Sequence, residues 1–445
     1  MNTTKAEFGE AETGRESYDC VVIGGGPAGS TVATLIAKAG HSVLVVERAK
    51  FPRFHIGESL LPETYWVFEK MGMLDKMKNS NFVKKYSVQF ASPGGRISAP
   101  FYFDERDPRE CSQTWQVERA KFDDMMLNHA AETGATVWQE TNVTEVLFEP
   151  SETDDLPRAT GVIVQRKGEE PRRIDARVVV DATGTTALIS KKLNIRKVDP
   201  QLRKAAVFSH FKNCARDPGK NGGATLVLAT KATDGWFWYI PLADDVTSVG
   251  VVGDVGRLIT NRTGTPEEIL QEEIANCAGL NGKMTNATRC GPVHVLNDFS
   301  YRANRCAGEG WVLVGDAFGF LDPMYSSGVF LALKSAQMAA DTINEALAAG
   351  DLSAASLSRW GDPLSEGMQT IRKLVYAFYT PGFSFGKFIR AYPDRVHDVT
   401  AVLVGDVFRP EVNDVFTPLG TMVPVPPSIP LEKPKAVEKE TVNAG

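Results

Sequence analysis

The sequence predicts an α/β fold in which a parallel sheet is interrupted by an inserted antiparallel sheet and followed by a helical C-terminal region. An apolar run at 18–23 ends in glycines and precedes a helical stretch, which is typical of a buried parallel strand. Apolar runs of the same kind recur much later, at 177–181 and 311–316. Between these runs, 204–253 holds several alternating or β-rich segments that predict an antiparallel sheet.

Composition excludes several classes of protein. The 445 residues are 43% hydrophobic and 23% charged, as in ordinary globular proteins, and the net charge of −6 gives no electrostatic reason to expect nucleic acid as a partner. The six cysteines and six histidines are scattered without the spacing of metal ligands. There is no apolar run of membrane-spanning length and no signal peptide, so we expect a soluble, cytoplasmic protein with reduced thiols.

The chain is expected to fold as one core with a helical extension. Residues 1–16 are predicted to be disordered, 17–347 to form the core with sheet insertions at about 86–118 and 196–305, 348–421 to be helical, and the Pro-rich 422–445 to be a disordered tail. Thr265-Pro-Glu-Glu268 is a capping box that opens a helix. The other expected helices are 27–38, 60–71, 121–132, 332–348, 357–379 and 393–407. The other expected strands are 42–47, 204–213, 224–230, 235–241 and 246–253.

A glycine-rich turn follows the first strand, in VVIGGGPAGS at 21–30. Gly24, Gly26 and Gly29 complete the pattern GxGxxG, in which the glycines permit a tight turn, close approach of a pyrophosphate and close helix packing. The anion would lie at the helix N-terminus. Glu47 ends the next strand, where a carboxylate accepts ribose hydroxyls. Strand, glycines, helix, strand and acid in this order predict a Rossmann-like dinucleotide site, although they do not distinguish NAD from FAD.

Three later stretches make that distinction. QVERAKFD at 116–123, VVVDATG at 178–184 and WVLVGDAFG at 311–319, in this order, resemble the FAD-dependent monooxygenase superfamily. The resemblance implies that Asp316 contacts the ribityl chain and that Arg119 lies near the pyrophosphate. Taken alone, Asp316 could cap a helix and Arg119 could be a surface charge. The implied FAD contacts are Gly24, Gly25, Gly26, Ala28, Gly29, Ser30, Glu47, Arg53, Arg119, Asp316, Pro323 and Val329.

Two tryptophans stand one residue apart in the stretch DGWFWYIPL. Because strand side chains alternate, Trp236, Trp238 and Ile240 share one face. From these residues alone we would infer a buried strand with two large core side chains. The pattern WxWxIP, which ends at Pro241, is a signature of the flavin-dependent halogenases, and the chain resembles that family over about 17–420. The resemblance implies that Trp236, Trp238, Ile240 and Pro241 pack beneath the flavin and keep a substrate away from its ring.

A second stretch, GFLDPMYSSGVFLAL at 319–333, matches the pattern FxxPxxSxG of the same family. The triplet Ser-Ser-Gly within it opens a helix, and a helix N-terminus offers unpaired N–H donors and a partial positive charge. By itself the triplet indicates an ordinary N-cap. The resemblance implies that halide binds to the backbone at Ser327 and Gly328.

A lysine pair lies in NFVKKYSVQF at 81–90. Alternation places Lys84 and Lys85 on opposite faces, so one of them faces inward. Without the resemblance, two solvated lysines on an edge strand would be favoured. In the halogenases, a lysine at this place captures hypohalous acid and delivers the electrophile, and we match it to Lys85, with Lys84 as the alternative. A buried lysine suits this task because it offers movable donors and its pKa shifts readily.

The resemblance therefore implies a two-site reaction. Reduced FAD and O2 form a C4a-hydroperoxide, chloride or bromide attacks it, and the hypohalous acid travels to Lys85, where an electron-rich aromatic ring reacts. With no second dinucleotide fingerprint in the sequence, FADH2 is expected from a separate flavin reductase. Tyr325 stands where tryptophan halogenases carry Glu, which favours a phenol or pyrrole, either free or tethered to a carrier protein. The sequence does not separate chloride from bromide.

Three other functions are compatible with parts of the sequence. A single-component FAD/NADPH aromatic hydroxylase shares the fold, but Asp181-Ala-Thr-Gly184 is not followed by the usual Arg, and the two indoles would obstruct a substrate at the flavin. A geranylgeranyl-reductase-like flavoprotein would not need WxWxIP. A non-catalytic flavin-binding protein would need neither FxxPxxSxG nor Lys85.

Overall fold

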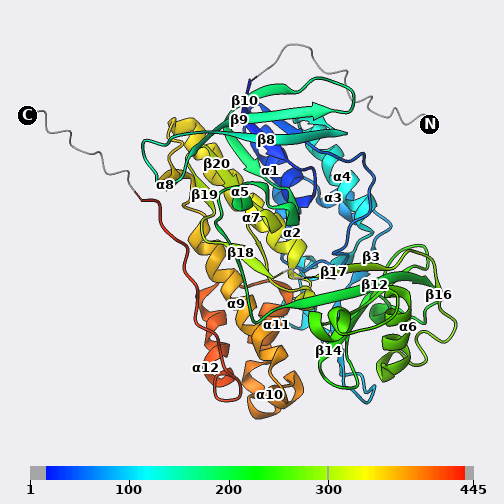
Figure 1. Cartoon of the computed structure of the whole chain (residues 1–445). Helices are drawn as coiled ribbons and strands as arrows, with labels where there is room; N and C mark the ends of the chain where they lie inside the picture. The colour runs from blue at the N-terminus through cyan, green and yellow to red at the C-terminus, as the bar shows by residue number, and fades with distance from the viewer. Residues whose placement is uncertain (1–16, 298–299, 436–445) are drawn as a thin grey trace, which may run out of the picture.

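The computed structural model describes residues 17–297 and 300–435, and its α/β architecture confirms the expected fold class (Figure 1). A parallel sheet forms the upper part of the molecule in Figure 1, with β1 between β2 and β10 and with β20 beside β10. These strands are runs of buried apolar residues, as expected where both faces of a sheet are covered. Their bounds are β1 (Ser17–Ile23), β2 (Val43–Val46), β7 (Thr136–Trp138), β10 (Arg172–Asp181), β19 (Ala307–Gly308) and β20 (Trp311–Leu313); β8 (Thr141–Glu149) and β9 (Arg158–Arg166) extend the sheet through β10.

The helices around this sheet are α1 (Pro27–Lys38), α2 (Thr64–Met71), α3 (Leu74–Lys78), α4 (Arg119–Glu132), α5 (Leu188–Lys192) and α7 (Ser327–Ala349), and α1 packs between α4 and α7. Four of them, α1, α2, α4 and α7, correspond to expected helices, whereas α3 and α5 were not expected. The helix expected from residue 60 begins only at Thr64. Residues 60–63 are held outside the helix because the Leu60 amide donates to the Trp115 carbonyl and the Glu63 amide donates to the Val404 carbonyl.

The inserted strands form a second sheet in the order β16-β12-β15-β14-β13-β4-β5, with β17 beside β12. The strands come from the two stretches assigned above as insertions, and a parallel pairing of β4 with β13 joins them into one sheet. Their bounds are β4 (Ser87–Ala91), β5 (Phe101–Tyr102), β12 (Lys204–Lys212), β13 (Thr225–Ala229), β14 (Gly235–Pro241), β15 (Thr247–Asp254), β16 (Thr288–Arg289) and β17 (His294–Asn297). A separate pair, β3 (Val83–Lys85) with β6 (Thr114–Gln116), carries the lysines. A small sheet of β11 (Arg196–Val198), β18 (Tyr301–Ala303) and β21 (Gly319–Phe320) completes the strands.

The two faces of the second sheet belong to different cores. Trp236, Trp238 and Ile240 of β14 join the main core, whereas Phe237 and Tyr239 join a smaller core under α6 (Pro266–Asn276). The expected capping box at the start of α6 is present. Alternation along β14 therefore turns the indoles toward the parallel sheet.

The C-terminal helices are drawn in orange and red in Figure 1, below the parallel sheet. They are α9 (Gly361–Tyr379), α10 (Phe385–Ala391), α11 (Val396–Val404) and α12 (Phe416–Leu419). The short helix α8 (Ala354–Leu357) precedes them and lies higher, against β19 and β20 of the parallel sheet. No helix within 17–297 and 300–435 is long and apolar enough to cross a lipid bilayer.

The prediction of a disordered tail is wrong for residues 422–435. Val423 and Leu431 are buried, the Glu432 amide donates to the Asn304 carbonyl, and Arg302 donates to the Pro430 carbonyl. A proline-rich segment is stiff and extended, so it loses little conformational entropy when it packs against the protein. Its composition does not reveal whether the folded protein offers a surface for this packing. The expected disorder of 1–16 and 436–445 lies outside the described residues.

Candidate active site

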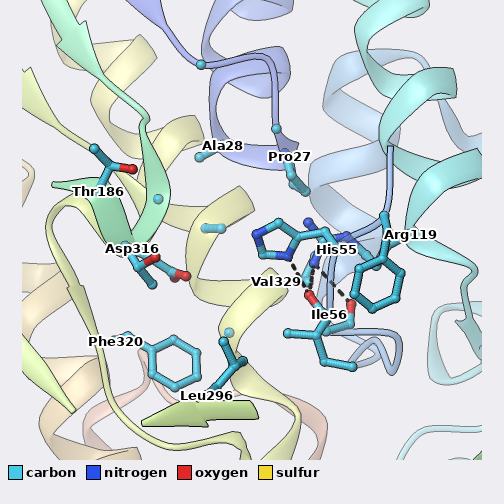
Figure 2. Close-up of a pocket in the computed structure, with 18 of the residues that line it drawn as sticks. Pro27, Ala28, His55, Ile56, Arg119, Thr186, Leu296, Asp316, Phe320 and Val329 are labelled. Atoms are coloured by element: carbon cyan, nitrogen blue, oxygen red, sulfur yellow. Dashed lines mark hydrogen bonds between the residues drawn. The ribbon is translucent and has the colours of Figure 1, made fainter. Parts of the chain in front are cut away.

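A cavity of about 610 Å³ lies between the parallel sheet and the indole-bearing face of the second sheet. Residues that follow β1, β2 and β10 line one end, which is the carboxyl edge where open α/β sheets bind ligands. Figure 2 shows the middle of the cavity: Pro27 and Ala28 at the start of α1, Arg119 and His55 on one side, Asp316 and Thr186 on the other, and Phe320 and Leu296 below. The site therefore draws on segments spread over the whole chain.

The glycine turn exposes backbone N–H groups to which a ligand can bind. A Cβ on Gly29 would lie 1.9 Å from the Gly24 carbonyl oxygen, and one on Gly24 would lie 2.5 Å from the Ala182 carbonyl oxygen, so neither position accepts a side chain. Gly26 is the N-cap of α1 and has no side chain to occupy the N–H donors of the first turn. These donors fit a pyrophosphate. The geometry is that of a dinucleotide-binding turn.

Glu47 is held rigidly at the same end of the cavity. Its Oε2 accepts a hydrogen bond from the Gly25 amide at 2.8 Å, and its Oε1 accepts one from the Ala49 amide at 2.8 Å. The carboxylate is buried and lines the cavity. Each oxygen keeps acceptor capacity, which suits two ribose hydroxyls.

Two arginines and one aspartate form a charged group at the middle of the cavity. Arg119 donates to both oxygens of Asp123, at 2.7 and 3.0 Å, and Arg53 donates to Asp123 Oδ2 at 2.9 Å. Both guanidinium groups line the cavity, so the cluster presents a net positive charge to it. Asp123 was not singled out from the sequence, although its spacing from Arg119 on α4 is that of an i,i+4 ion pair.

Asp316 lies across the cavity from Arg119 (Figure 2). Burial raises the pKa of its carboxyl to about 6, and the positive charge of Arg119 opposes this shift. The side chain is thus available as a hydrogen-bond acceptor beside Thr186, as a contact with a polyol chain requires. Its role toward the ribityl chain stays a prediction.

The indoles form part of the cavity wall at the other end. Trp236 and Trp238 line the cavity with Ile240, and their rings lie 6.2 Å apart. The Trp236 indole N–H donates to the Tyr379 hydroxyl at 2.9 Å, and that of Trp238 donates to the Ser248 hydroxyl at 3.0 Å. Both rings are therefore fixed by a hydrogen bond as well as by packing. The turn before α7 lines the same cavity.

That turn carries the predicted halide site. Phe320, Pro323, Ser326 and Gly328 line the cavity. Ser326 has φ 56°, in the left-handed region, and its side chain makes no capping hydrogen bond to the helix that starts at Ser327. The first N–H groups of α7 therefore remain available to an anion.

The expected contacts do not all reach the cavity. Ala28, Arg53 and Val329 line it together with the residues described above. The expected site residues that are absent from its lining are Gly25, Gly29, Ser30, Lys85, Ser327 and Pro241. Gly25 and Ser30 instead support the turn, since the Ser30 hydroxyl donates to the Gly25 carbonyl at 2.9 Å. Pro241 pairs with Thr247 at the end of β14, beyond the cavity.

Lys85 is buried behind the cavity wall, with 2% of its surface exposed, whereas Lys84 is exposed. Its ammonium donates to the Ser59 hydroxyl at 2.9 Å and to the Leu60 carbonyl at 3.0 Å. Ser59 itself lines the cavity, so a single hydroxyl separates the lysine from it. Burial lowers the pKa of Lys85 to about 7, which makes both protonation states accessible near neutral pH. Ser59 was not singled out from the sequence because its contact with Lys85 is made only in the fold.

Glu58 and His210 form an ion pair beside the cavity. Glu58 is 2% exposed and lines the cavity; its Oε1 lies 2.6 Å from His210 Nε2, and its Oε2 has no hydrogen-bond partner among the described residues. Burial opposes protonation of His210, but the hydrogen bond and charge of Glu58 outweigh it and raise the pKa of the imidazole. The positive charge of His210 therefore compensates the Glu58 carboxylate, which reaches the cavity with one oxygen still able to accept a hydrogen bond.

Replacement of His210 by alanine is expected to lower the free energy of unfolding by about 2 kcal/mol at pH 6, because a buried carboxylate loses its partner. Since the folded pKa of His210 is raised, its stabilisation is fully present below about pH 6.5 and is lost as pH rises through the folded value. The difference between wild type and His210→Ala should therefore shrink from pH 6 to pH 9. Urea unfolding across this range measures it, and a difference that does not depend on pH would contradict the ion pair.

Comparison with known proteins gives matches over nearly the whole chain. The model of the tryptophan halogenase family matches residues 19–106 and 104–382. A 1H-pyrrole-2-carbonyl-[peptidyl-carrier protein] chlorinase of Pseudomonas fluorescens is 32% identical over 420 residues, covering 89% of this chain and 92% of the relative. The corresponding brominase of Pseudoalteromonas luteoviolacea is 31% identical, covering 88% and 93%. The structure of the myxobacterial chondrochloren halogenase superposes with a TM-score of 0.75 at 32% identity, over 94% of this chain and all of the other.

Proposed function

The chain belongs to the tryptophan halogenase family and is a flavin-dependent halogenase that uses FADH2, O2 and a halide, and we propose that it chlorinates or brominates a pyrrole or phenol ring held on a carrier protein. The observation that carries the proposal is the buried Lys85, one hydroxyl away from a cavity closed by two indoles. Two relatives similar over most of their length act, by name, on pyrrolyl carrier proteins.

The residues of the cavity fit FAD along its whole length. The N–H donors of the glycine turn would bind the pyrophosphate, with Arg53 and Arg119 balancing its charge, Glu47 would accept ribose hydroxyls, and Asp316 would contact the ribityl chain. The isoalloxazine would then lie at the indole end, beside the turn before α7. When bound and reduced, the flavin supplies the oxygen chemistry that converts halide into hypohalous acid.

The protein's contribution at this end is to hold the halide and exclude other reactants. The first N–H groups of α7 at Ser327 and Gly328 would bind the halide beside the ring. Trp236 and Trp238 would fill the space in which an aromatic substrate could approach the flavin. A closed cavity also protects the oxidant from water and thiols.

Lys85 would then direct the oxidant to the substrate. Its ammonium donates a proton to the oxygen of hypohalous acid as the oxygen–halogen bond breaks, the halogen bonds to a ring carbon, and water leaves. The ring proton returns to the amine, so the lysine is regenerated. A pKa near 7 suits both transfers. Ser59 lies between the cavity and the lysine and would pass the oxidant on.

The substrate class follows from the side chain at position 325. Tyr325 is buried, its hydroxyl donates to the Leu374 carbonyl at 3.1 Å, and burial raises its pKa well above the ordinary value. It therefore cannot act as the base that a carboxylate provides. An aromatic ring that is already electron-rich, such as a phenol or pyrrole, does not need such a base.

The proposal predicts a halogenated product when the protein is incubated with FAD, a flavin reductase, NADH, bromide or chloride, and a pyrrolyl or phenolic carrier protein. Mass spectrometry of the carrier should show a halogen isotope pattern that disappears without halide. A mass increase of one oxygen atom would instead identify a hydroxylase. Reaction of the free ring at the rate of the tethered one would remove the carrier from the proposal.

A separate, anaerobic experiment tests the supply of reduced flavin. We expect NADPH alone to leave the bound flavin oxidised, because the sequence contains one dinucleotide fingerprint, which FAD would occupy. Anaerobic absorbance at the flavin band measures this, with added reductase as the positive control. Rapid bleaching by NADPH without a reductase would contradict the need for a partner enzyme.

A further inference from the structure

Two hydrogen bonds in series connect the indole wall, through the end of helix α9, to the residue before the halide-binding turn. The Trp236 indole N–H donates to the Tyr379 hydroxyl at 2.9 Å, and that hydroxyl donates to Asp322 Oδ2 at 3.0 Å. Tyr379 is the last residue of α9, and Asp322 lies immediately before the turn that precedes α7. Trp236 and Asp322 are each only 1% exposed. Three segments distant in sequence thus meet at one buried carboxyl group.

The other oxygen of Asp322 fixes the turn itself. Asp322 Oδ1 accepts a hydrogen bond from the Met324 amide at 2.9 Å and caps the short 3₁₀ turn of Pro323–Tyr325. The next residue, Ser326, is held in the left-handed conformation, which is unfavourable for a residue with a Cβ and needs support from its surroundings. The cap therefore helps to determine where the first N–H groups of α7 point.

Helix α9 contacts this turn a second time. The Tyr325 hydroxyl of the turn donates to the Leu374 carbonyl of α9. Tyr379 of α9 donates in the opposite direction, to Asp322 at the start of the turn. On the far side, the Lys204 ammonium lies 4.1 Å above the ring of Tyr379 and donates to Asp254 at 2.7 Å. The turn is consequently held against α9 at two points.

We propose that Asp322 and Tyr379 are positioning residues that keep the Trp236 indole and the halide-binding turn in one arrangement, and so couple helix α9 to halide affinity. The inference rests on the proposed binding of halide at Ser327 and Gly328. Loss of the Tyr379 hydroxyl leaves the indole N–H without its acceptor and frees one side of the Asp322 cap, so the turn can relax away from the geometry that binds an anion.

The charge of Asp322 gives the network a second effect on halide. Burial raises the pKa of this carboxyl to about 7, against the lowering effects of the Met324 amide, the Tyr379 hydroxyl and the more distant Lys204 charge. Tyr325, on the same turn, stays protonated. A neutral Asp322 leaves the anion undisturbed, whereas the ionised form repels it. Halide should therefore bind more weakly as pH rises through about 7.

The test is the bromide dissociation constant of the oxidised FAD-loaded protein, measured from the rise of its melting temperature with bromide concentration. Tyr379→Phe is expected to raise this constant about fivefold, the value of one ordinary hydrogen bond, and to leave the FAD dissociation constant within about twofold. The matched control is Tyr376→Phe on the same helix, whose hydroxyl donates to Asp199 and which should bind bromide as wild type does. Asp322→Asn should remove the pH dependence of bromide binding between pH 6 and 8.5.

The possible outcomes distinguish failure of the halide site from failure of the positioning network. A wild-type protein whose melting temperature does not respond to bromide would overturn the halide site itself. A responsive wild type with an unchanged Tyr379→Phe, or with equal losses in Tyr379→Phe and Tyr376→Phe, would overturn the positioning network alone. Asp322→Asn with the wild-type pH dependence would overturn its electrostatic part.

Discussion

Replacement of Lys85 by methionine is expected to abolish halogenation, with product formation reduced by at least about 10³-fold. Methionine fills nearly the same volume but offers no donor to the oxidant and no amine to take the ring proton. The Ser59 hydroxyl keeps Thr225 as a partner at 2.9 Å, so the neighbouring structure should survive. Halogenated carrier protein, quantified by mass spectrometry, gives the rate, and titration with FAD should give a dissociation constant within about twofold of wild type.

Flavin reoxidation and thiol capture show which step of the reaction Lys85→Met has lost. In Lys85→Met the reduced flavin should still be reoxidised in the presence of bromide at the wild-type rate, because the cavity and the turn before α7 are untouched. Hypohalous acid then leaks into solution, where an added thiol captures it. Lys84→Met is the matched control, since its side chain is exposed and precedes Lys85 in the same strand. Retention of halogenation by Lys85→Met, or its loss in Lys84→Met, would reject the assignment.

Some of the site could be predicted because its determinants are local. Gly29 is forced by a backbone contact with Gly24 within one strand–turn–helix unit, and that unit carries its own sequence pattern. Alternation along β14 is equally local, and it placed Trp236 and Trp238 on one face. Alternation also placed Lys84 and Lys85 on opposite faces, but only the family resemblance chose Lys85, and the structure buries Lys85 and exposes Lys84.

The rest of the site depends on contacts between distant segments. Ser59 reaches Lys85, Glu58 reaches His210, and Tyr379 reaches Trp236 only after two sheets and the C-terminal helices have packed. A tyrosine at the end of an amphipathic helix has no feature in the sequence that names its partner. Tertiary packing decides such pairs, so they emerge from the structure alone.

Substitution of Gly29 by alanine is expected to weaken FAD binding by about 100-fold, the largest effect we expect outside Lys85. The new Cβ would lie 1.9 Å from the Gly24 carbonyl oxygen and 3.3 Å from the Ala182 Cβ, and the nearer atom belongs to backbone that cannot rotate away. Gly24 cannot move toward Ala182 either, since it already approaches the carbonyl there closely. The turn must therefore open and carry the N–H donors of α1 away from the pyrophosphate, and overpacking of this kind costs about 1–3 kcal/mol.

Gly94→Ala is the matched control for this substitution, because a Cβ at Gly94 meets no atom within 4 Å. Purified Gly29→Ala should contain little flavin, whereas Gly94→Ala should contain as much as wild type, and equilibrium titration of the apoproteins with FAD measures the two dissociation constants. Circular dichroism of the apoproteins checks that both remain folded. Because the clash lies in the turn that would bind the pyrophosphate and not at the indole end, bromide at saturating FAD should still raise the melting temperature of Gly29→Ala. A flavin content equal to that of wild type would mean that FAD does not lie against this turn, and the orientation assigned to the whole cofactor would have to be abandoned.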